Sequence, residues 1–480
     1  MGKYIKLFKT TSQYNAYTAD TENFITPNVS LCEDAMTDVH YHPYHDYSQD
    51  YFTMVVTTGG YIKWSGSTTA NTLSYSKDNG STWTTADSST TISVAAGDKV
   101  LWKGAPTPQS YKGIGKFSGD TNARYFVEGN AMSLLFGDNF NGQTSLGGKT
   151  YALYVLFYGN TNVTSAENLS LPATTLANNC YGNMFRDCTS ITTAPELPAT
   201  TLANWCYSNM FGGCTSLTTA PELPATTLEG NCYYYMFSSC TSLTTAPELP
   251  ATTLAEACYG GMFQGCTSLT TAPELPATTL ADSCYSDMFN GCTSLTTAPE
   301  LPVKTLADSC YGSMFQGCTS LTTAPELPAT TLAEACYADM FQGCTSLTTA
   351  PELPATTLEG YCYRFMFSGC TSLTTAPELP ATTLKTYCYQ DMFRGCTSLT
   401  TAPELSATTL ATACYTEMFY GCTNLSSIKC LATNISAIFC TDSWVSGVAA
   451  SGTFTKAASM TSWTTGVNGI PTNWTVVDAT

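Results

Sequence analysis

Charged residues are scarce in this sequence, and positive ones are scarcest. They make up 11% of 480 residues, with 18 Lys and Arg against 36 Asp and Glu, a formal net charge of −18. Most of the excess lies between Leu171 and Cys430, which hold 20 acidic and 6 basic residues. Nucleic acids and anionic membranes attract basic surfaces, so neither is expected as a partner.

Histidine is almost absent, and the motifs of common enzyme classes are missing. The chain has 3 His, and it lacks G-x-S-x-G, P-loop, H-E-x-x-H and dinucleotide-binding patterns. A Ser or Cys nucleophile needs a neighbouring base. Carboxylates recur uniformly along the chain, whereas a glycosidase needs one distinctive pair across a cleft. We therefore expect no enzymatic activity, no catalytic residues and no required cofactor.

Long hydrophobic runs are also missing. No stretch approaches 18 consecutive apolar residues, so no membrane-spanning segment is expected. The first residues, M-G-K-Y-I-K-L-F-K-T, lack the apolar core of a secretory signal. This favours release by a route such as lysis of a cell that has assembled a phage particle, with a hidden export route as the alternative.

What the sequence does contain is one motif repeated ten times from about Leu171 to Ile428: L-P-A-T-T-L-A-x-x-C-Y-x-x-M-F-x-G-C-T-S-L-T-T-A-P-E. The step between copies is always 26 residues. A fixed period of this length indicates stacked units, each of which buries its apolar face only against a neighbour. The prediction is an α/β solenoid of ten 26-residue coils.

Residues 275–300 represent one unit. Leu280, Cys284 and Met288 recur at helical spacing, and Gly291 occupies the position of a left-handed C-cap. The Thr-rich segment around Leu295 favours a short parallel strand. Each coil is therefore predicted to contain a strand, a turn and a short helix.

The core M-F-x-G-C-T-S-L followed by L-P-x-x-x-L resembles the BspA-like leucine-rich repeats. The resemblance extends from roughly Phe140 to Trp474. It implies a solenoid of the kind found on surface proteins of gut and oral bacteria and in tail-associated proteins of their phages.

The copies differ at the two positions before the first Cys, the two after Tyr and the one after Phe. Aromatic and Arg side chains, the types that dominate interface energies, occupy several of these positions. We interpret them as a binding surface on the outer face, with drift at solvated positions as the alternative: Trp205, Tyr234, Tyr235, Tyr361, Arg364, Phe365, Tyr387, Arg394 and Tyr420.

One Glu recurs in nearly every copy. Like charges at coil spacing repel, so we expect a structural ladder in which each carboxylate accepts backbone N–H groups. A cation-binding or basic-partner face is the alternative. The ladder consists of Glu196, Glu222, Glu248, Glu274, Glu300, Glu326, Glu352, Glu378 and Glu404.

Of the 23 cysteines, 20 occur as two per coil, eight residues apart. Without an export signal, buried thiols are favoured over disulfides, although bridges between adjacent coils are conceivable. The histidines lie together near the N-terminus. His40 and His42 would point the same way on a strand and could share a metal across a symmetric oligomer, but histidines in a surface loop explain the same pattern.

The remaining segments divide the chain into five parts. Residues 1–50 are assigned to attachment or oligomerisation, and 51–110 to a small all-β, immunoglobulin-like sandwich. Within the sandwich, Gly59-Gly60 predicts a hairpin, and S-K-D-N-G-S-T-W (76–83) resembles the structural Asp-box hairpin. Residues 111–170 are predicted to be degenerate capping coils, 171–430 the solenoid and 431–480 the C-terminal cap.

These expectations combine into a non-enzymatic adhesion protein. The favoured form is a phage tail-fibre-like component of the virion whose solenoid contacts a glycan or protein on a bacterial surface. It would be attached to other virion proteins through residues 1–150, or form a homotrimer. The alternatives are a bacterial surface or secreted adhesin, and a structural virion protein without a receptor role.

Overall fold

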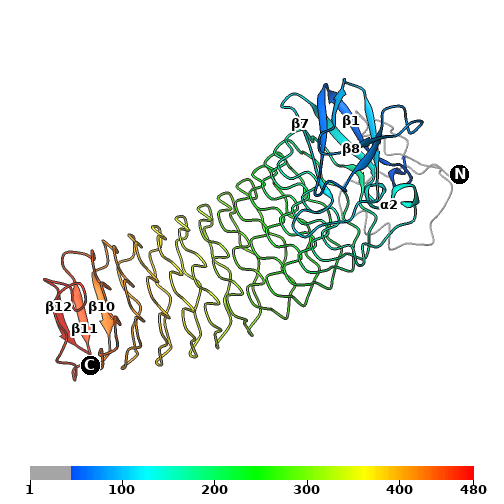
Figure 1. The fold of residues 1–480 in the computed structure, drawn as a ribbon. Coiled ribbons are helices and arrows are strands. Elements are labelled where there is room, and N and C mark those ends of the chain that lie inside the picture. The colour runs from blue at the N-terminus through cyan, green and yellow to red at the C-terminus, as the bar shows by residue number, and fades with distance from the viewer. Residues whose placement is uncertain (1–44, 480) are drawn as a thin grey trace, which may run out of the picture.

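A computed structural model describes residues 45–479, and the predicted metal ligands His40 and His42 lie outside this range. Figure 1 shows a gently curved rod of stacked coils, with a β-domain at its N-terminal end and a short parallel sheet at its C-terminal end. None of the described helices is long and apolar enough to cross a membrane.

The N-terminal domain is all-β, as predicted. Its strands are β1 (Phe52–Thr58), β2 (Gly60–Gly66), β3 (Leu73–Ser76), β4 (Thr84–Ala86), β5 (Thr91–Val94), β6 (Lys99–Lys103), β7 (Gly115–Gly119) and β8 (Arg124–Asn130). With β9 (Asn168–Ser170) they form a six-stranded sheet of order β4-β3-β6-β1-β8-β9 and a three-stranded sheet of order β5-β2-β7. The more specific expectation of an immunoglobulin-like sandwich stays a prediction.

Two details of this domain differ from expectation. The hairpin predicted at Gly59-Gly60 is wrong, because β1 pairs with β6 and β8 whereas β2 pairs with β5 and β7. The chain passes from one sheet to the other at this point. Strands β7 and β8 fall within the range assigned to capping coils, so the β-domain continues beyond residue 110. The short helix η2 (Tyr47–Gln49) precedes β1, whereas α2 (Ser133–Phe136) and η3 (Gly137–Asn139) follow β8.

The helix predicted in each coil is wrong. In the type copy, residues 281–292 form what we call the turn ribbon, a chain of linked tight turns. Ser283, Asp287 and Gly291 have φ of 55°, 57° and 74°, a left-handed residue at every fourth position. A right-handed helix cannot include such residues. The turn ribbon repeats every four residues. Over two repeats, this period spaces the apolar side chains as a helix would.

Backbone hydrogen bonds explain why the ribbon replaces the helix. Alternate N–H groups close turns within a coil, as from Met288 to the Tyr285 carbonyl at 3.2 Å. The others reach the next coil, as from Tyr285 to the Cys310 carbonyl at 3.0 Å and from Phe289 to the Met314 carbonyl at 2.9 Å. A helix would use all of its interior N–H groups internally, so the ribbon satisfies the backbone and joins the coils together.

The core of the rod consists of columns of identical side chains. Tyr285 stacks on Tyr311 with ring centroids 5.9 Å apart, and Phe289 stacks on Phe315 at 5.8 Å. The predicted strand is reduced to single parallel bridges, such as Thr297 with Thr323. Among residues 45–479, longer parallel pairings lie at the two ends: β8 pairs with β9 at the N-terminal end, and β10 (Ser427–Cys430), β11 (Thr453–Lys456) and β12 (Thr475–Asp478) form one sheet at the C-terminal end.

The aromatic column continues into the β-domain. Phe185 stacks on Phe157 at 5.2 Å, Phe157 on Phe117 at 5.6 Å, and Phe117 on Phe52 at 5.7 Å. Asn160 occupies the position of the second cysteine in this first coil and donates to the Phe117 carbonyl at 3.1 Å. The β-domain therefore covers the N-terminal end of the rod and shares its core.

Candidate functional site

The nine predicted binding residues all lie on the turn ribbon, at positions before, between and after its buried Cys-Tyr and Met-Phe pairs. We call this outer side of the ribbon the ribbon face. Trp205, Tyr235 and Tyr361 have φ of 61°, 54° and 59°, and Phe365 and Tyr387 have φ of 53° and 58°. These variable side chains therefore stand at left-handed positions of the backbone. The four-residue period of the turn ribbon directs them away from the core, as the predicted helix would also have done.

The first aromatic group on the ribbon face comprises Trp205, Tyr234 and Tyr235. Trp205 meets Tyr234 edge-on with centroids 5.6 Å apart, and Tyr234 meets Tyr235 edge-on at 4.3 Å. Trp205 remains 39% exposed. The next coil has Gly260 and Gly261 here, and a Cβ on Gly261 would lie 2.3 Å from the Tyr235 ring. Sequence analysis missed these glycines, although the Tyr-Tyr and Gly-Gly pairs in successive copies were a visible signal.

The second aromatic group comprises Tyr361, Arg364, Phe365 and Tyr387. Tyr361 and Tyr387 stack with centroids 4.9 Å apart and an interplanar angle of 13°. The Arg364 guanidinium carbon lies 4.7 Å from the Phe365 centroid and 5.9 Å from that of Tyr361, within the range of cation–π attraction. Two neighbouring coils thus present one cation among three rings.

Arg394 and Tyr420 form a third group with a different electrostatic environment. The Arg394 guanidinium carbon lies 4.7 Å from the Tyr420 centroid. The side chain also contacts Asp391 at 3.1 Å and Glu417. Burial raises the pKa of Asp391, and the hydrogen bond from Arg394 opposes this shift. Asp391 and Glu417 were not predicted, because the sequence alone did not place them beside the Arg.

Between the aromatic groups, the ribbon face is polar. The Asn290 amide donates to the Gln316 side-chain oxygen at 2.8 Å, and Gln316 bonds to Gln342 in the next coil. Asp308 accepts the Glu334 backbone N–H at 3.0 Å. These side chains satisfy one another across coils, so the middle of the face offers few free donors.

The nine predicted ladder glutamates are all exposed at the surface. Among residues 45–479, none of them accepts a backbone N–H, which is the contact expected for a structural ladder. Of the nine, Glu404 alone forms an ion pair within residues 45–479, with the Lys429 ammonium at 2.8 Å. The column is therefore a line of solvated like charges along the rod, and its role beyond that stays a prediction.

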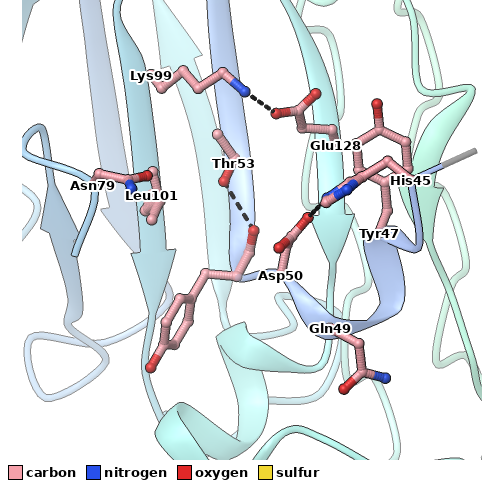
Figure 2. A pocket seen from close by; sticks show the side chains of 10 residues that line it. His45, Tyr47, Gln49, Asp50, Thr53, Asn79, Lys99, Leu101 and Glu128 are labelled. Carbon is pink, nitrogen blue, oxygen red and sulfur yellow. Dashed lines mark hydrogen bonds and ion pairs between the residues drawn. The ribbon is translucent and has the colours of Figure 1, made fainter. Parts of the chain in front are cut away.

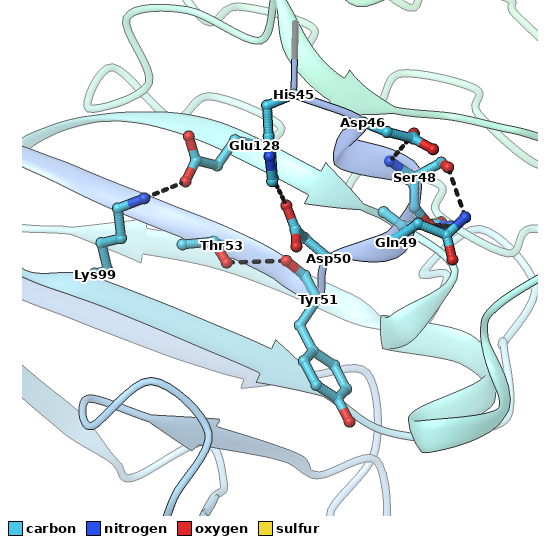
Figure 3. Close-up of polar contacts among 10 residues, drawn as sticks. His45, Asp46, Ser48, Gln49, Asp50, Tyr51, Thr53, Lys99 and Glu128 are labelled. Carbon is cyan, nitrogen blue, oxygen red and sulfur yellow. Dashed lines mark hydrogen bonds and ion pairs between the residues drawn. The ribbon is translucent and has the colours of Figure 1, made fainter. Parts of the chain in front are cut away.

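A shallow hollow of about 540 Å³ lies in the β-domain, where residues 45–51 pass over the outer side of the six-stranded sheet (Figure 2). Glu128 on β8 bonds to Lys99 on β6 at 2.8 Å, and His45 bonds to Asp50. Figure 3 shows that both carboxylates already face a cation or an imidazole within the chain. Both carboxylates of the hollow therefore have a partner within the chain.

The Asp-box resemblance corresponds to a braced turn between β3 and β4. Asp78 accepts the Thr82 backbone N–H at 2.8 Å, the Thr82 hydroxyl at 2.6 Å and the Ser76 hydroxyl at 2.7 Å. These bonds, the Thr82 hydroxyl first, lower the pKa of Asp78 from 3.8 to about 2. The Lys103 ammonium lies 4.1 Å from the Trp83 centroid. The motif holds the turn together structurally.

Within residues 45–479, no group of three or more His, Cys, Asp or Glu side chains is arranged to hold an ion. The 22 cysteines of this range are free thiols, as favoured from the sequence.

Comparison with known proteins identifies the repeats. A family model described as "BspA type Leucine rich repeat region (6 copies)" matches residues 157–268, 256–366 and 339–441. No curated protein and no solved structure matches the chain. The matched segments together cover more than half of the sequence, and this chain belongs to the BspA type leucine-rich repeat family.

Proposed function

We propose that this chain is a non-enzymatic recognition protein that binds its partner through the ribbon face. Repeats of this family are commonly adhesion or protein-binding modules, and proteins that carry them are often found at cell surfaces or outside the cell. One observation carries the proposal. The core columns are constant from coil to coil, whereas Trp, Tyr and Arg gather at the variable positions of one outer face.

The finer form of the proposal is a receptor-binding component of a phage tail, which contacts a bacterial surface glycan or protein. A bacterial surface or secreted adhesin is the second candidate, and a structural virion protein the third. Attachment through the N-terminal 150 residues and assembly as a homotrimer belong to the first candidate.

The test is binding of labelled full-length protein to a panel of intact gut bacteria. The variant Tyr234→Ser/Tyr235→Ser/Arg364→Gln/Phe365→Ser disrupts both aromatic groups without touching the core columns. A matched control, Glu274→Gln/Glu300→Gln/Glu326→Gln, changes exposed side chains outside the turn ribbon. Strain-selective binding that the first variant loses and the control retains is the expected result.

Other outcomes discriminate between the alternatives. Loss of binding in the control alone would place recognition on the glutamate column. Equal binding by all three proteins would overturn the proposal that the ribbon face binds the partner. No binding by any of them would favour the structural role.

A further inference from the structure

Arg364 differs from the other arginines of the ribbon face because it has no partner for its hydrogen-bond donors. Within residues 45–479, no hydrogen bond or ion pair is formed by its side chain, and its Nε is buried without an acceptor. A guanidinium carries five N–H donors and no acceptor. Buried donors without acceptors are rare in folded proteins, because each costs the free energy of lost hydration.

Arg394, one coil further on, provides an internal comparison. Both guanidinium carbons lie 4.7 Å from an aromatic centroid, Arg364 at Phe365 and Arg394 at Tyr420. Arg394 also contacts two carboxylates of its own chain, Asp391 and Glu417. The Arg364 group also sets a guanidinium beside an aromatic ring, but no carboxylate of the described residues forms an ion pair with it.

Asp339 is the acidic group of the preceding coil that interacts with Arg364. The charge of Arg364 lowers the pKa of Asp339, but burial has the larger effect and raises it. The two side chains do not form an ion pair. Asp339 therefore leaves the terminal Nη groups of Arg364 without an acceptor among residues 45–479, and a partner can reach these donors although Nε is buried.

We propose that the Arg364 group, together with Tyr361, Phe365 and Tyr387, binds a single carboxylate from an acidic side chain of a partner protein. An Arg fork matches a carboxylate in bidentate geometry, and the flanking rings exclude water from the contact. The inference rests on the proposed function, because it assumes that the ribbon face binds a partner.

The surroundings of Arg364 favour a protein over an acidic polysaccharide or nucleic acid. Asp339 lies in the preceding coil, where its backbone N–H donates to the Arg364 carbonyl at 2.7 Å, and its side chain is only partly buried. A polymer with a negative charge on every unit would bring a further charge close to this carboxylate and be repelled. An isolated Asp or Glu flanked by uncharged or basic residues would not be.

The test uses the full chain and a yeast-displayed library of random twelve-residue peptides. Peptides selected on the native protein are synthesised in pairs, with each Asp or Glu present or replaced by its amide. The expected result is one carboxylate per peptide whose conversion to the amide weakens binding roughly tenfold or more, in keeping with charge-assisted hydrogen bonds. Arg364→Gln should abolish that difference, whereas the matched control Arg394→Gln should preserve it.

Four results would count against the inference, each in a distinct way. Selected peptides that bind equally well as acid and amide would overturn it. Carboxylate dependence that persists in Arg364→Gln would also overturn it. Selected peptides that depend on Tyr361 and Tyr387 but not on Arg364 would overturn it while supporting the proposed function. Failure to select any peptide would count against both.

A structural role for Arg364 predicts a different readout. If the side chain served only to hold the coils together, Arg364→Gln would lower the thermal midpoint and leave the acid–amide difference unchanged. We expect the reverse, with the midpoint unchanged or slightly raised, because the substitution removes an unpaired buried donor.

Discussion

The thiol of Cys292 donates a hydrogen bond to the carbonyl oxygen of Phe263 in the preceding coil, 3.1 Å away. The same contact recurs along the rod, as from Cys318 to Phe289 and from Cys344 to Phe315, both at 3.1 Å. The first cysteine of the type copy, Cys284, has no such acceptor among the described residues. Both cysteines are fully buried, so only the hydrogen bond distinguishes them.

This difference predicts how each position tolerates serine. Cys292→Ser places a hydroxyl where the Phe263 carbonyl can accept it, whereas Cys284→Ser buries a hydroxyl without an acceptor. Cys284→Ser should lower the free energy of unfolding by roughly 1 kcal/mol more than Cys292→Ser. Urea unfolding monitored by circular dichroism measures both, with the two Cys→Ala variants as controls for lost sulfur volume. Equal losses for the two serine variants would contradict the hydrogen bond.

The buried thiols should not react in the native protein. Burial raises the pKa of Cys284 and of Cys292 to about 12, so both remain protonated at pH 8. A thiol reagent at pH 8 should therefore leave the 22 described cysteines unmodified, and about 23 groups should react after unfolding in guanidinium. Cys32→Ser is the control for the cysteine outside the described residues. Rapid reaction of many native thiols, or a low count after unfolding, would contradict the prediction.

The glutamate column should make stability depend on salt. Glu274 and Glu300 occupy the same exposed position in successive coils, with no cation bonded to either in the described residues. Salt screens repulsion between exposed charges, so the thermal midpoint should rise between 10 mM and 200 mM NaCl. Glu274→Gln/Glu300→Gln should reduce that rise. Glu404→Gln is the control, because it also removes a favourable contact with Lys429. A salt response unaffected by the paired substitution would show that the repulsion is negligible.

The Asp78 turn predicts how the β-domain responds to acid. Its folded pKa, about 2, lies below the ordinary 3.8, so its contribution is complete above about pH 4. It is then lost as the pH falls towards 2. The destabilisation caused by Asp78→Asn, measured by urea unfolding with tryptophan fluorescence, should therefore shrink between pH 5 and pH 2. Thr82→Val should produce a similar loss that is not additive with Asp78→Asn. A destabilisation by Asp78→Asn that stays the same between pH 5 and pH 2 would contradict this account.

Several features could be inferred from the sequence because they depend on local or periodic chemistry. A 26-residue period that repeats Leu, Cys, Met and Phe requires stacked coils, whatever the backbone does between them. The left-handed conformation expected at Gly291 is present. The outward placement of Tyr234 and Arg364 also followed from the period, since four-residue spacing separates inside from outside in a helix and in the turn ribbon alike.

Other features were decided only by tertiary structure. The N–H of Tyr285 can bond within its own coil or to Cys310 of the next, and stacking selects the second. That choice replaces the predicted helix with turns, because a helix leaves no N–H groups for a neighbour. The same holds for charge pairing. The repeat period places Arg364 and Arg394 on one face. Only the packing of the coils puts two carboxylates beside Arg394 and leaves Arg364 without an ion pair.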